Sequence, residues 1–389
     1  MSLHRLESLA RTALPEMTDD LRALVELETP SRDKELLNAG LAAVEEWTRR
    51  RLGPPDASRR YEGGPHGDML ELLYPGTLPA TVLMLCHYDT VWPAGTLSEW
   101  PFRVTDDGLA SGPGVFDMKC GLVQAVWALR LLRELDLPRP AVRLFLNGDE
   151  EIGSPASRPH IERLSEDVTA TLVCEAAAGS EGALKTARKG VGMFEVTVDG
   201  VEAHAGLDPE RGASAVHALA ELVTRIAALG SPEHGTTVNV GVISGGTQGN
   251  VVAGHARCAV DVRIAEPAEA ARIDAALAGL RPSDPRAEAT VTGGWNRPPM
   301  VPGPASRLLF KQAQAIAADL GWTAGETAVG GASDGNFVAA LGRPVLDGLG
   351  AVGDGAHARH EHVRLDQVPT RTALLAGLLA ACGMAQPYE

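Results

Sequence analysis

The stretch that most limits the possible folds of this chain is a continuous apolar run at residues 82–86, which ends directly in His87, Tyr88 and Asp89. A strand covered on both faces of a parallel sheet needs such a run, because neither face meets water. Open α/β sheets carry their chemistry at the carboxyl ends of these strands. His87 and Asp89 point to the same side of an extended backbone, so the carboxylate can orient the imidazole, as at many metal sites. Taken alone, the pair is also typical of a buried histidine bonded to a neighbouring acid.

Further apolar runs at residues 142–146 and 170–174 are also predicted to be strands. Residues 119–135 have the apolar spacing of an amphipathic helix. Nearer the amino terminus we expect helices over residues 18–29 and 31–52, the second with Ser31 as its N-cap. The alternation of strands and helices predicts an α/β fold whose mostly parallel sheet is flanked by helices.

The pattern changes after residue 188, where strands at 193–198 and 258–264 alternate apolar and polar side chains, as strands with one wet face do. One such strand is expected to run from 251 to 264. The predicted elements follow the order strand, helix, strand, strand, helix, strand, which is that of a ferredoxin-like split βαβ unit. We therefore expect a small α+β domain at residues 188–295, inserted between the two parts of a larger α/β domain, residues 1–187 and 296–389.

Composition restricts the partners. With 389 residues the chain is too long for one ordinary core. A formal charge of −15 argues against a nucleic-acid groove or an anionic membrane surface. No segment is long and apolar enough to span a membrane, and charges interrupt the amino terminus, which is unlike a secretory signal. The five cysteines form no CxxC pair and are expected to be reduced thiols of a cytoplasmic protein.

Side chains that bind divalent cations stand at the predicted strand ends and in the loops beside them: His87, Asp117, the cluster Asp149-Glu150-Glu151, Glu175 and His357. Histidines and carboxylates together suit zinc, with cobalt or manganese as substitutes. So many carboxylates favour two ions that share a bridging aspartate and activate a water between them. One of two adjacent glutamates can bind metal while its neighbour acts as the general base, a role for which Asp149 also competes.

Four motifs make the chain resemble the dinuclear zinc metallopeptidases and deacylases, a family that includes glutamate carboxypeptidase, succinyl-diaminopimelate desuccinylase and acetylornithine deacetylase. They are HYDTV at 87–91, GPGVFDMKCG at 112–121, DEEIGS at 149–154 and GAHARHEHV at 355–363. The resemblance covers essentially the whole chain and is closest to the glutamate carboxypeptidase branch.

The resemblance implies two zinc ions per chain, one held by His87, Asp117 and Glu175 and the other by Asp117, Glu151 and His357. It further implies that Asp89 orients His87, that Glu150 is the general base, and that the peptide after Asp117 is cis. His360 and His362 are expected at the rim of the site, and Glu361 matches a family position without a ligand role.

In the inserted domain, the segment EAHAG at 202–206 resembles a family turn whose histidine, here His204, reaches across a homodimer to stabilise the oxyanion. Asn250 and Arg263 match the substrate-binding asparagine and arginine, and a guanidinium is the expected partner of a carboxylate. The chain departs from the family pattern at Ala203 and Ala253, where serine and proline are common.

The resemblance thus implies a zinc-dependent exopeptidase of the carboxypeptidase type, which removes the C-terminal amino acid of a small peptide or an N-acyl amino acid. An N-acyl amino-acid deacylase or desuccinylase of amino-acid metabolism is the alternative. Two other hypotheses remain. Residues 331–335 fit the G-x-S-x-G elbow of serine hydrolases around Ser333, with Asp354 and His357 after it. A non-catalytic amino-acid binder on the same fold would lack a ligand or the base, and none is missing.

Overall fold

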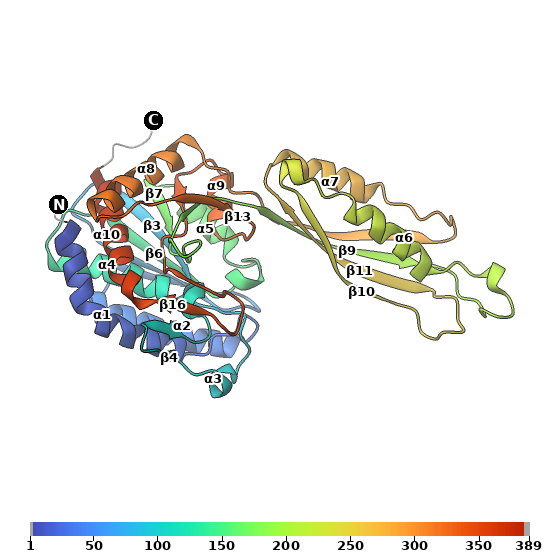
Figure 1. Ribbon diagram of the computed structural model, residues 1–389, viewed down its shortest axis with the longest axis horizontal. Coiled ribbons are helices and arrows are strands. Elements are labelled where there is room, and N and C mark those ends of the chain that lie inside the picture. Colours follow the sequence, from blue (N-terminus) through green and yellow to red (C-terminus); the bar gives the residue numbers. More distant parts are fainter. Residues whose placement is uncertain (1–2, 385–389) are drawn as a thin grey trace. The chain divides into compact units, whose positions relative to one another are not determined.

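The computed structural model describes residues 3–384, which fold into two compact units (Figure 1). The first comprises residues 3–187, 302–329 and 333–384 of the described chain. The second comprises Arg188–Val301 and Gly330–Ala332, where the sequence suggests an insertion at residues 188–295. Within residues 3–384, every helix is too short or too polar to cross a bilayer.

The first unit is built on a mixed sheet that, among residues 3–384, has the strand order β1-β2-β6-β3-β7-β14. The pairs β6–β3, β3–β7 and β7–β14 are parallel, whereas β1 and β2 are antiparallel additions at one edge. The predicted α/β fold with a mostly parallel sheet is confirmed. The strands are β1 (Ala57–Tyr61), β2 (Met69–Tyr74), β3 (Thr81–His87), β6 (Ala141–Asn147), β7 (Ala170–Val173) and β14 (Val345–Leu346).

Helices cover both faces of this sheet, and the alternation of side chains along β3 shows how. Met84 and Cys86 join the core beneath α1, α2, α4, α8 and α10, whereas Leu83 and Leu85 pack on the opposite face with residues of α5 and α9. Because helices cover both faces of the sheet at β3, residues 82–86 of this strand are all apolar. Helices α1, α4 and α10 pack against one another (Figure 1). The helices of this unit are α1 (Leu3–Val25), α2 (Lys34–Leu52), α3 (Thr96–Glu99), α4 (Cys120–Glu134), α5 (Arg158–Leu164), α8 (Pro304–Asp319), α9 (Gly335–Ala340) and α10 (Val368–Met384).

Two small sheets complete the first unit. The strands β13 and β8 form one, and the other has the order β15-β16-β5-β4. These strands are β4 (Arg103–Val104), β5 (Leu109–Ser111), β8 (Leu184–Arg188), β13 (Glu326–Val329), β15 (Gly353–Asp354) and β16 (His362–Arg364). In the second of these sheets, β5 precedes Asp117 in the chain, and β15 and β16 flank the loop that contains His357. Because β5 pairs with β16, this sheet holds the two segments together.

Two predictions near the amino terminus are wrong. The helix expected at residues 18–29 is the end of α1, which begins at Leu3 and continues through Pro15. Asp33 caps α2, because its side chain accepts a hydrogen bond from the Leu36 amide, whereas the Ser31 hydroxyl donates to the Thr90 carbonyl. Gly53 ends α2 with a positive φ of 74°, which glycine adopts without strain.

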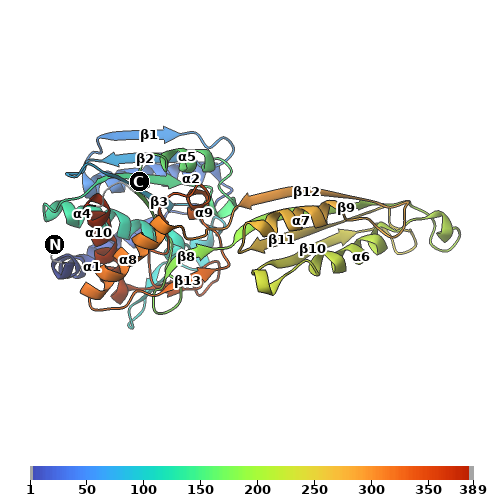
Figure 2. The same cartoon turned by 90° about the horizontal axis from the view of Figure 1, so that it is seen from above.

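The second unit is an antiparallel sheet with the order β10-β11-β9-β12, and helices α6 and α7 run along it (Figure 2). This is the order and direction of a ferredoxin-like unit. Val196, Val198, Val260 and Val262 supply its core from alternate strand positions. The expected strand 251–264 begins only at His255, because Val251 and Val252 pair instead with the segment at Ala203 and His204. The elements are β9 (Gly190–Asp199), α6 (Ala215–Ala227), β10 (Thr237–Gly245), β11 (His255–Ile264), α7 (Ala268–Ala278) and β12 (Glu288–Arg297).

Candidate metal centre

The candidate site lies at the carboxyl ends of three neighbouring parallel strands. His87 is the last residue of β3, and Glu175 follows β7 by two residues. Glu150 and Glu151 follow β6 in a short helical turn. Because His87 pairs in register with Asn147, and Leu85 with Val173, the three strands end side by side. Sheet geometry therefore brings together side chains that are distant in sequence.

Asp117 lies between two histidines. Its Oδ1 is 3.1 Å from His87 Nε2, and its Oδ2 is 3.4 Å from His357 Nε2. Each imidazole nitrogen has a second carboxylate beside it, because His87 Nε2 is 3.3 Å from Glu175 Oε1 and His357 Nε2 is 3.0 Å from Glu151 Oε2. The five side chains expected to bind metal thus form one continuous series of contacts, with the two oxygens of Asp117 directed to different histidines.

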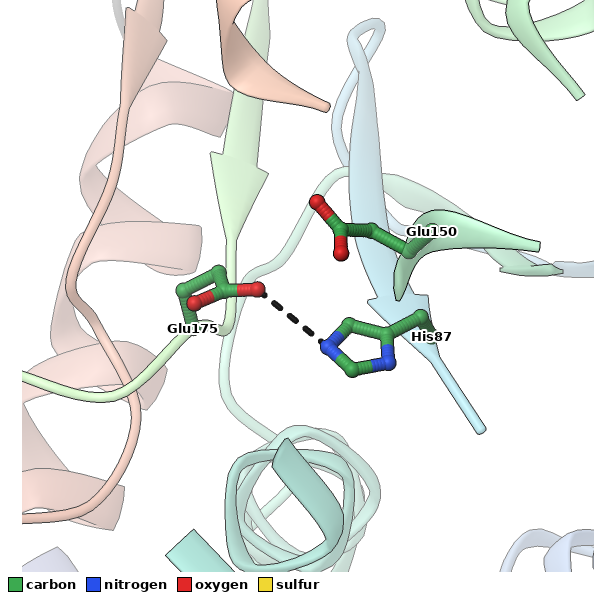
Figure 3. Close-up of side chains that lie close together, drawn as sticks. All are labelled: His87, Glu150 and Glu175. Atoms are coloured by element: carbon green, nitrogen blue, oxygen red, sulfur yellow. Dashed lines mark ion pairs between the residues drawn. The ribbon is translucent and has the colours of Figure 1, made fainter. Parts of the chain in front are cut away.

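Figure 3 shows the side chains of His87, Glu150 and Glu175 directed toward one another from separate strand ends. Possible ligand atoms of these three lie within 4.8 Å of one another, as do those of His87, Asp117 and Glu151. Imidazole nitrogens and carboxylate oxygens are the donors that zinc prefers. Buried carboxylates packed this closely repel one another, so the donor set fits bound divalent cations.

The electrostatics reflect this crowding. Burial, together with the charge of Asp117, raises the pKa of Glu151 to about 7. Burial alone would raise the pKa of Asp117, but hydrogen bonds with His357 and His87 hold it well below its usual range. The bonds with Asp117 and Glu151 raise the pKa of His357 to about 11. Burial would lower the pKa of His87, yet its bonds with Asp117, Asp89 and Glu175 raise it well above the ordinary value.

Asp89 is fully buried and supports the other side of His87. The His87 Nδ1 lies 3.1 Å from the Asp89 carbonyl oxygen and 3.3 Å from its Oδ1. The Asp89 carboxylate also accepts the backbone N–H groups of Glu150 and Glu151, each at 3.3 Å. Because Asp89 keeps Nδ1 protonated, loss of the Nε2 proton would leave a lone pair directed toward Asp117 and Glu175, as a metal-ligating histidine requires.

Asp149 has a different position from its two neighbours. Its Oδ2 accepts the amides of Ala156 at 2.7 Å and Ser157 at 3.1 Å, and the residue is fully buried. These two hydrogen bonds hold the loop after β6 in place and occupy the Asp149 carboxylate. The geometry therefore favours Glu150 over Asp149 as the base.

Ser333 does not have the surroundings of a nucleophile. Its hydroxyl donates to Asp347 Oδ2 at 2.5 Å and accepts the Gly335 amide at 3.1 Å, close to the start of α9. The preceding strand β13 has half-exposed and exposed residues, whereas a nucleophile elbow requires a buried strand. The geometry gives no support to the serine-hydrolase hypothesis.

Glu361 is the residue whose environment the sequence did not reveal. It is buried, and its carboxylate accepts four hydrogen bonds, three of them from backbone N–H groups at or just before Asp117. The peptide bond between Asp117 and Met118 is cis, as the resemblance implies. His360 is exposed and His362 half-buried, and neither joins the two groups of close ligand atoms. An acid flanked by two histidines looks solvated in sequence, so no local signal indicated this burial.

The remaining predicted residues belong to the second unit. His204 is exposed, and its Nδ1 accepts the amides of Gly206 and Leu207, both at 3.1 Å, which leaves Nε2 to carry the ring proton. Arg263 forms a two-pronged ion pair with Asp261 at 2.7 and 2.8 Å. Asn250 is exposed, and its backbone carbonyl accepts the Ala205 amide.

A cavity of about 430 Å³ adjoins Glu151 within the first unit. Its lining is mixed: Pro30, Val91, Pro93 and Ile152 are apolar, whereas Arg32 is a cation and Asp33 and Glu151 are acids. A cavity of this size beside the candidate ligands has room for a side chain of a small substrate.

Comparison with known proteins identifies the family. Residues 83–381 match the Peptidase family M20/M25/M40. The chain belongs to this family. It is 29% identical over 380 residues to carboxypeptidase G2 of Pseudomonas sp. (strain RS-16), covering 95% of this chain and 90% of that protein. The predicted resemblance to the glutamate carboxypeptidase branch is therefore confirmed, and the chain is a metal-dependent hydrolase.

Solved structures agree on the fold. A tripeptidase from Staphylococcus aureus superposes with a TM-score of 0.78 at 21% identity, covering 96% of this chain and 99% of that one. An M20 family metallo-carboxypeptidase from Sulfolobus solfataricus superposes with a TM-score of 0.76 at 18% identity, covering 95% and 100%. The differing names of these neighbours leave the type of peptide open.

Proposed function

We propose that this chain is a zinc-dependent carboxypeptidase that hydrolyses the amide bond of a C-terminal amino acid in a small peptide or N-acyl amino acid. The observation that carries the proposal is the position of Asp117, whose two oxygens face two histidines that each have a second carboxylate at hand. The similarity over 95% of the chain to a protein named as a carboxypeptidase supports the substrate class.

The proposed ligands are His87, Asp117 and Glu175 for one ion and Asp117, Glu151 and His357 for the other. Two divalent ions, when bound, supply a polarised carbonyl and an acidified water. Glu150 accepts the proton of the attacking water at its carboxylate and passes it to the leaving amine. Asp89 holds the orientation of His87 throughout.

The second unit supplies the remaining groups in this proposal. His204 of the partner subunit donates from Nε2 to the carbonyl oxygen as negative charge develops there, because its Nδ1 is already an acceptor. Arg263 and Asn250 bind the free carboxylate of the substrate, for which Arg263 exchanges its pairing with Asp261. The cavity beside Glu151 receives a side chain of the substrate.

A homodimer through the second unit is part of the proposal. Strand β10 is an edge strand, and Val242 and Ile243 on it are 64% and 58% exposed. An exposed apolar edge favours pairing with another strand. We also propose the cytoplasm as the location, because all five cysteines are buried and unpaired, as thiols in a reducing compartment are.

The test compares three substrates with the zinc-loaded protein: an N-blocked dipeptide with a free carboxylate, its C-terminal amide, and the acetyl derivative of the same C-terminal amino acid. A carboxypeptidase cleaves the first far faster than the second. A preference for the acetyl amino acid would instead favour the deacylase. Activity that survives dialysis against a chelator but is lost in Ser333→Ala would overturn the metal mechanism.

A further inference from the structure

The carboxylate of Glu361 connects two segments that carry proposed metal ligands. Its Oε1 accepts the backbone N–H groups of Phe116 at 2.8 Å and Asp117 at 3.0 Å. Its Oε2 accepts the Gly114 amide at 3.0 Å and the indole N–H of Trp92 at 3.0 Å. The residue is 1% exposed, so these bonds are shielded from water. Both oxygens are thus committed to structure, and neither is a member of the two groups of close ligand atoms among the described residues.

The other end of this connection is the turn that carries His357. The Ala358 amide bonds to the Gly355 carbonyl, and the Glu361 amide bonds to the Ala358 carbonyl. His357 sits in this turn with a positive φ of 62°, and its side chain is 53% exposed. Apart from its contacts with Asp117 and Glu151, this exposed ring has little packing to hold it, so the backbone position that Glu361 anchors helps to set where Nε2 lies.

We propose that Glu361 is a positioning residue that sets Asp117 and His357 at the separation needed to bind the second ion. This inference rests on the proposed function, because it assumes that these two side chains are ligands. Glu361 touches neither ion nor substrate in this account. Carboxylates that accept several backbone N–H groups in a shielded place make strong, directional bonds. Residues that orient metal ligands typically change metal affinity 10- to 100-fold when replaced.

The proposal predicts an unusual effect of glutamine at this position. Glu361→Gln keeps the size of the side chain but replaces one acceptor oxygen with an NH₂ group, which then faces two N–H donors. The second ion should bind at least about tenfold more weakly, while the ion on the His87 and Glu175 side binds as before. Glu99→Gln is the matched control, because Glu99 is an exposed acid that contacts Arg359 in the same loop.

Trp92→Phe supplies a sharper readout, because it removes one donor without removing an acceptor. In the native background this change should weaken the second ion about three- to tenfold. The NH₂ group of Glu361→Gln can take the place of either oxygen, and Trp92→Phe leaves only the Gly114 amide opposite one of these places. In the Glu361→Gln background the same change should therefore weaken the second ion less than it does in the native chain. Two independent effects would instead add, so that Trp92→Phe weakened the second ion equally in both backgrounds.

The experiment is a titration of the metal-free full chain and its variants with Co²⁺, followed by visible absorption, with circular dichroism in chelator as the check on folding. The proposal is supported by two ions in the native chain, selective weakening of one of them in Glu361→Gln, and a smaller effect of Trp92→Phe in that background than in the native chain. Equal affinities in native and Glu361→Gln chains would overturn it, as would equal weakening of both ions. A native chain that binds no Co²⁺ would instead refute the metal site itself. Should Glu361→Gln fail to fold, an unchanged second affinity in Trp92→Phe alone is sufficient to reject the inference.

Discussion

Glu150 and Glu151 are adjacent in the chain but face different partners. Glu151 contacts His357 at 3.0 Å, whereas Glu150 lies with His87 and Glu175. We expect Glu150→Gln to keep two ions per chain and to lower kcat about 10²- to 10⁴-fold, because an amide cannot take a proton from water. Metal analysis of the purified variant beside its kcat measures both effects. Loss of an ion from Glu150→Gln, with both kept in Glu151→Gln, would reverse the two roles.

Gly121 allows α4 to approach the strand end that carries Glu175. A methyl group at this position would overlap the carbonyl oxygen of Cys174. Gly121→Ala should therefore lower the free energy of unfolding by about 1–3 kcal/mol, since overpacking forces the backbone to shift. Gly303→Ala is the control, because a methyl group there meets nothing within 4 Å. Thermal unfolding of both variants decides the matter, and equal midpoints would contradict the close approach.

The residues of the site differ in how far sequence could reveal them. His87 was accessible to prediction because it ends an apolar run, which fixes its place at the edge of a sheet. Glu361 was not, because its burial depends on amide groups about 245 residues away in the chain. A carboxylate between two histidines resembles a solvated acid until those amides are located. Only the structure shows that its four donors converge.

At the scale of elements, local patterns predicted the strands better than the ends of helices. The apolar runs at 142–146 and 170–174 correspond to β6 and β7. The start of α1 was missed because Pro15 lies inside the helix, and proline normally ends one. The burial of Leu6, Ala10, Met17, Leu21 and Leu24 shows why the helix continues past it. Tertiary packing of that apolar face outweighs the local penalty.

In the second unit, one buried carboxylate anchors α7. Glu269 accepts hydrogen bonds from Arg272 at 2.5 and 2.8 Å and from Thr236 at 2.5 Å. These bonds lower the pKa of its carboxyl from 4.5 to about 2, although burial opposes them. Because the folded pKa is the lower one, the stabilisation is complete above about pH 4.5 and is lost as the pH falls toward 2.

Glu269→Gln should therefore lower the thermal midpoint at pH 6, with a loss of about 1–2 kcal/mol, and the difference from the native chain should shrink on acidification toward pH 3. Glu233→Gln is the matched control, since its side chain is 83% exposed in the same unit. A difference that stays constant from pH 6 to pH 3 would show that the ionised carboxylate is not the source of the stability.

At the scale of the whole molecule, the proposed ligands come from residues 87 to 357, and no local pattern specifies that they meet. Parallel strands guarantee that His87, Glu151 and Glu175 share an edge of the sheet. They do not specify where the loops bearing Asp117 and His357 fold. Residue types alone marked Asp117 and His357 as candidate ligands, but their grouping with the other ligands into two metal sites followed from the family motifs.

Before metal binds, the imidazoles of His87 and His357 carry protons that the ions must displace. With the pKa of His357 at about 11 and that of His87 well above its usual value, both imidazoles are charged at neutral pH. A metal ligand needs the neutral ring. Binding of both ions should therefore release about two protons, with a further fraction from Glu151, whose pKa is about 7. Proton release means that affinity rises with pH and falls on acidification.

We therefore expect the product of the two metal affinities to drop about 100-fold for each pH unit between 8 and 6. Competition with a chelating dye at several pH values measures the affinities, and an indicator in weakly buffered solution counts the protons. His357→Gln should reduce the release by about one proton. His255→Gln, which alters an exposed histidine paired with Asp199 in the second unit, should leave it unchanged. Affinities that do not vary with pH would contradict the displacement of imidazole protons from His87 and His357 by the ions.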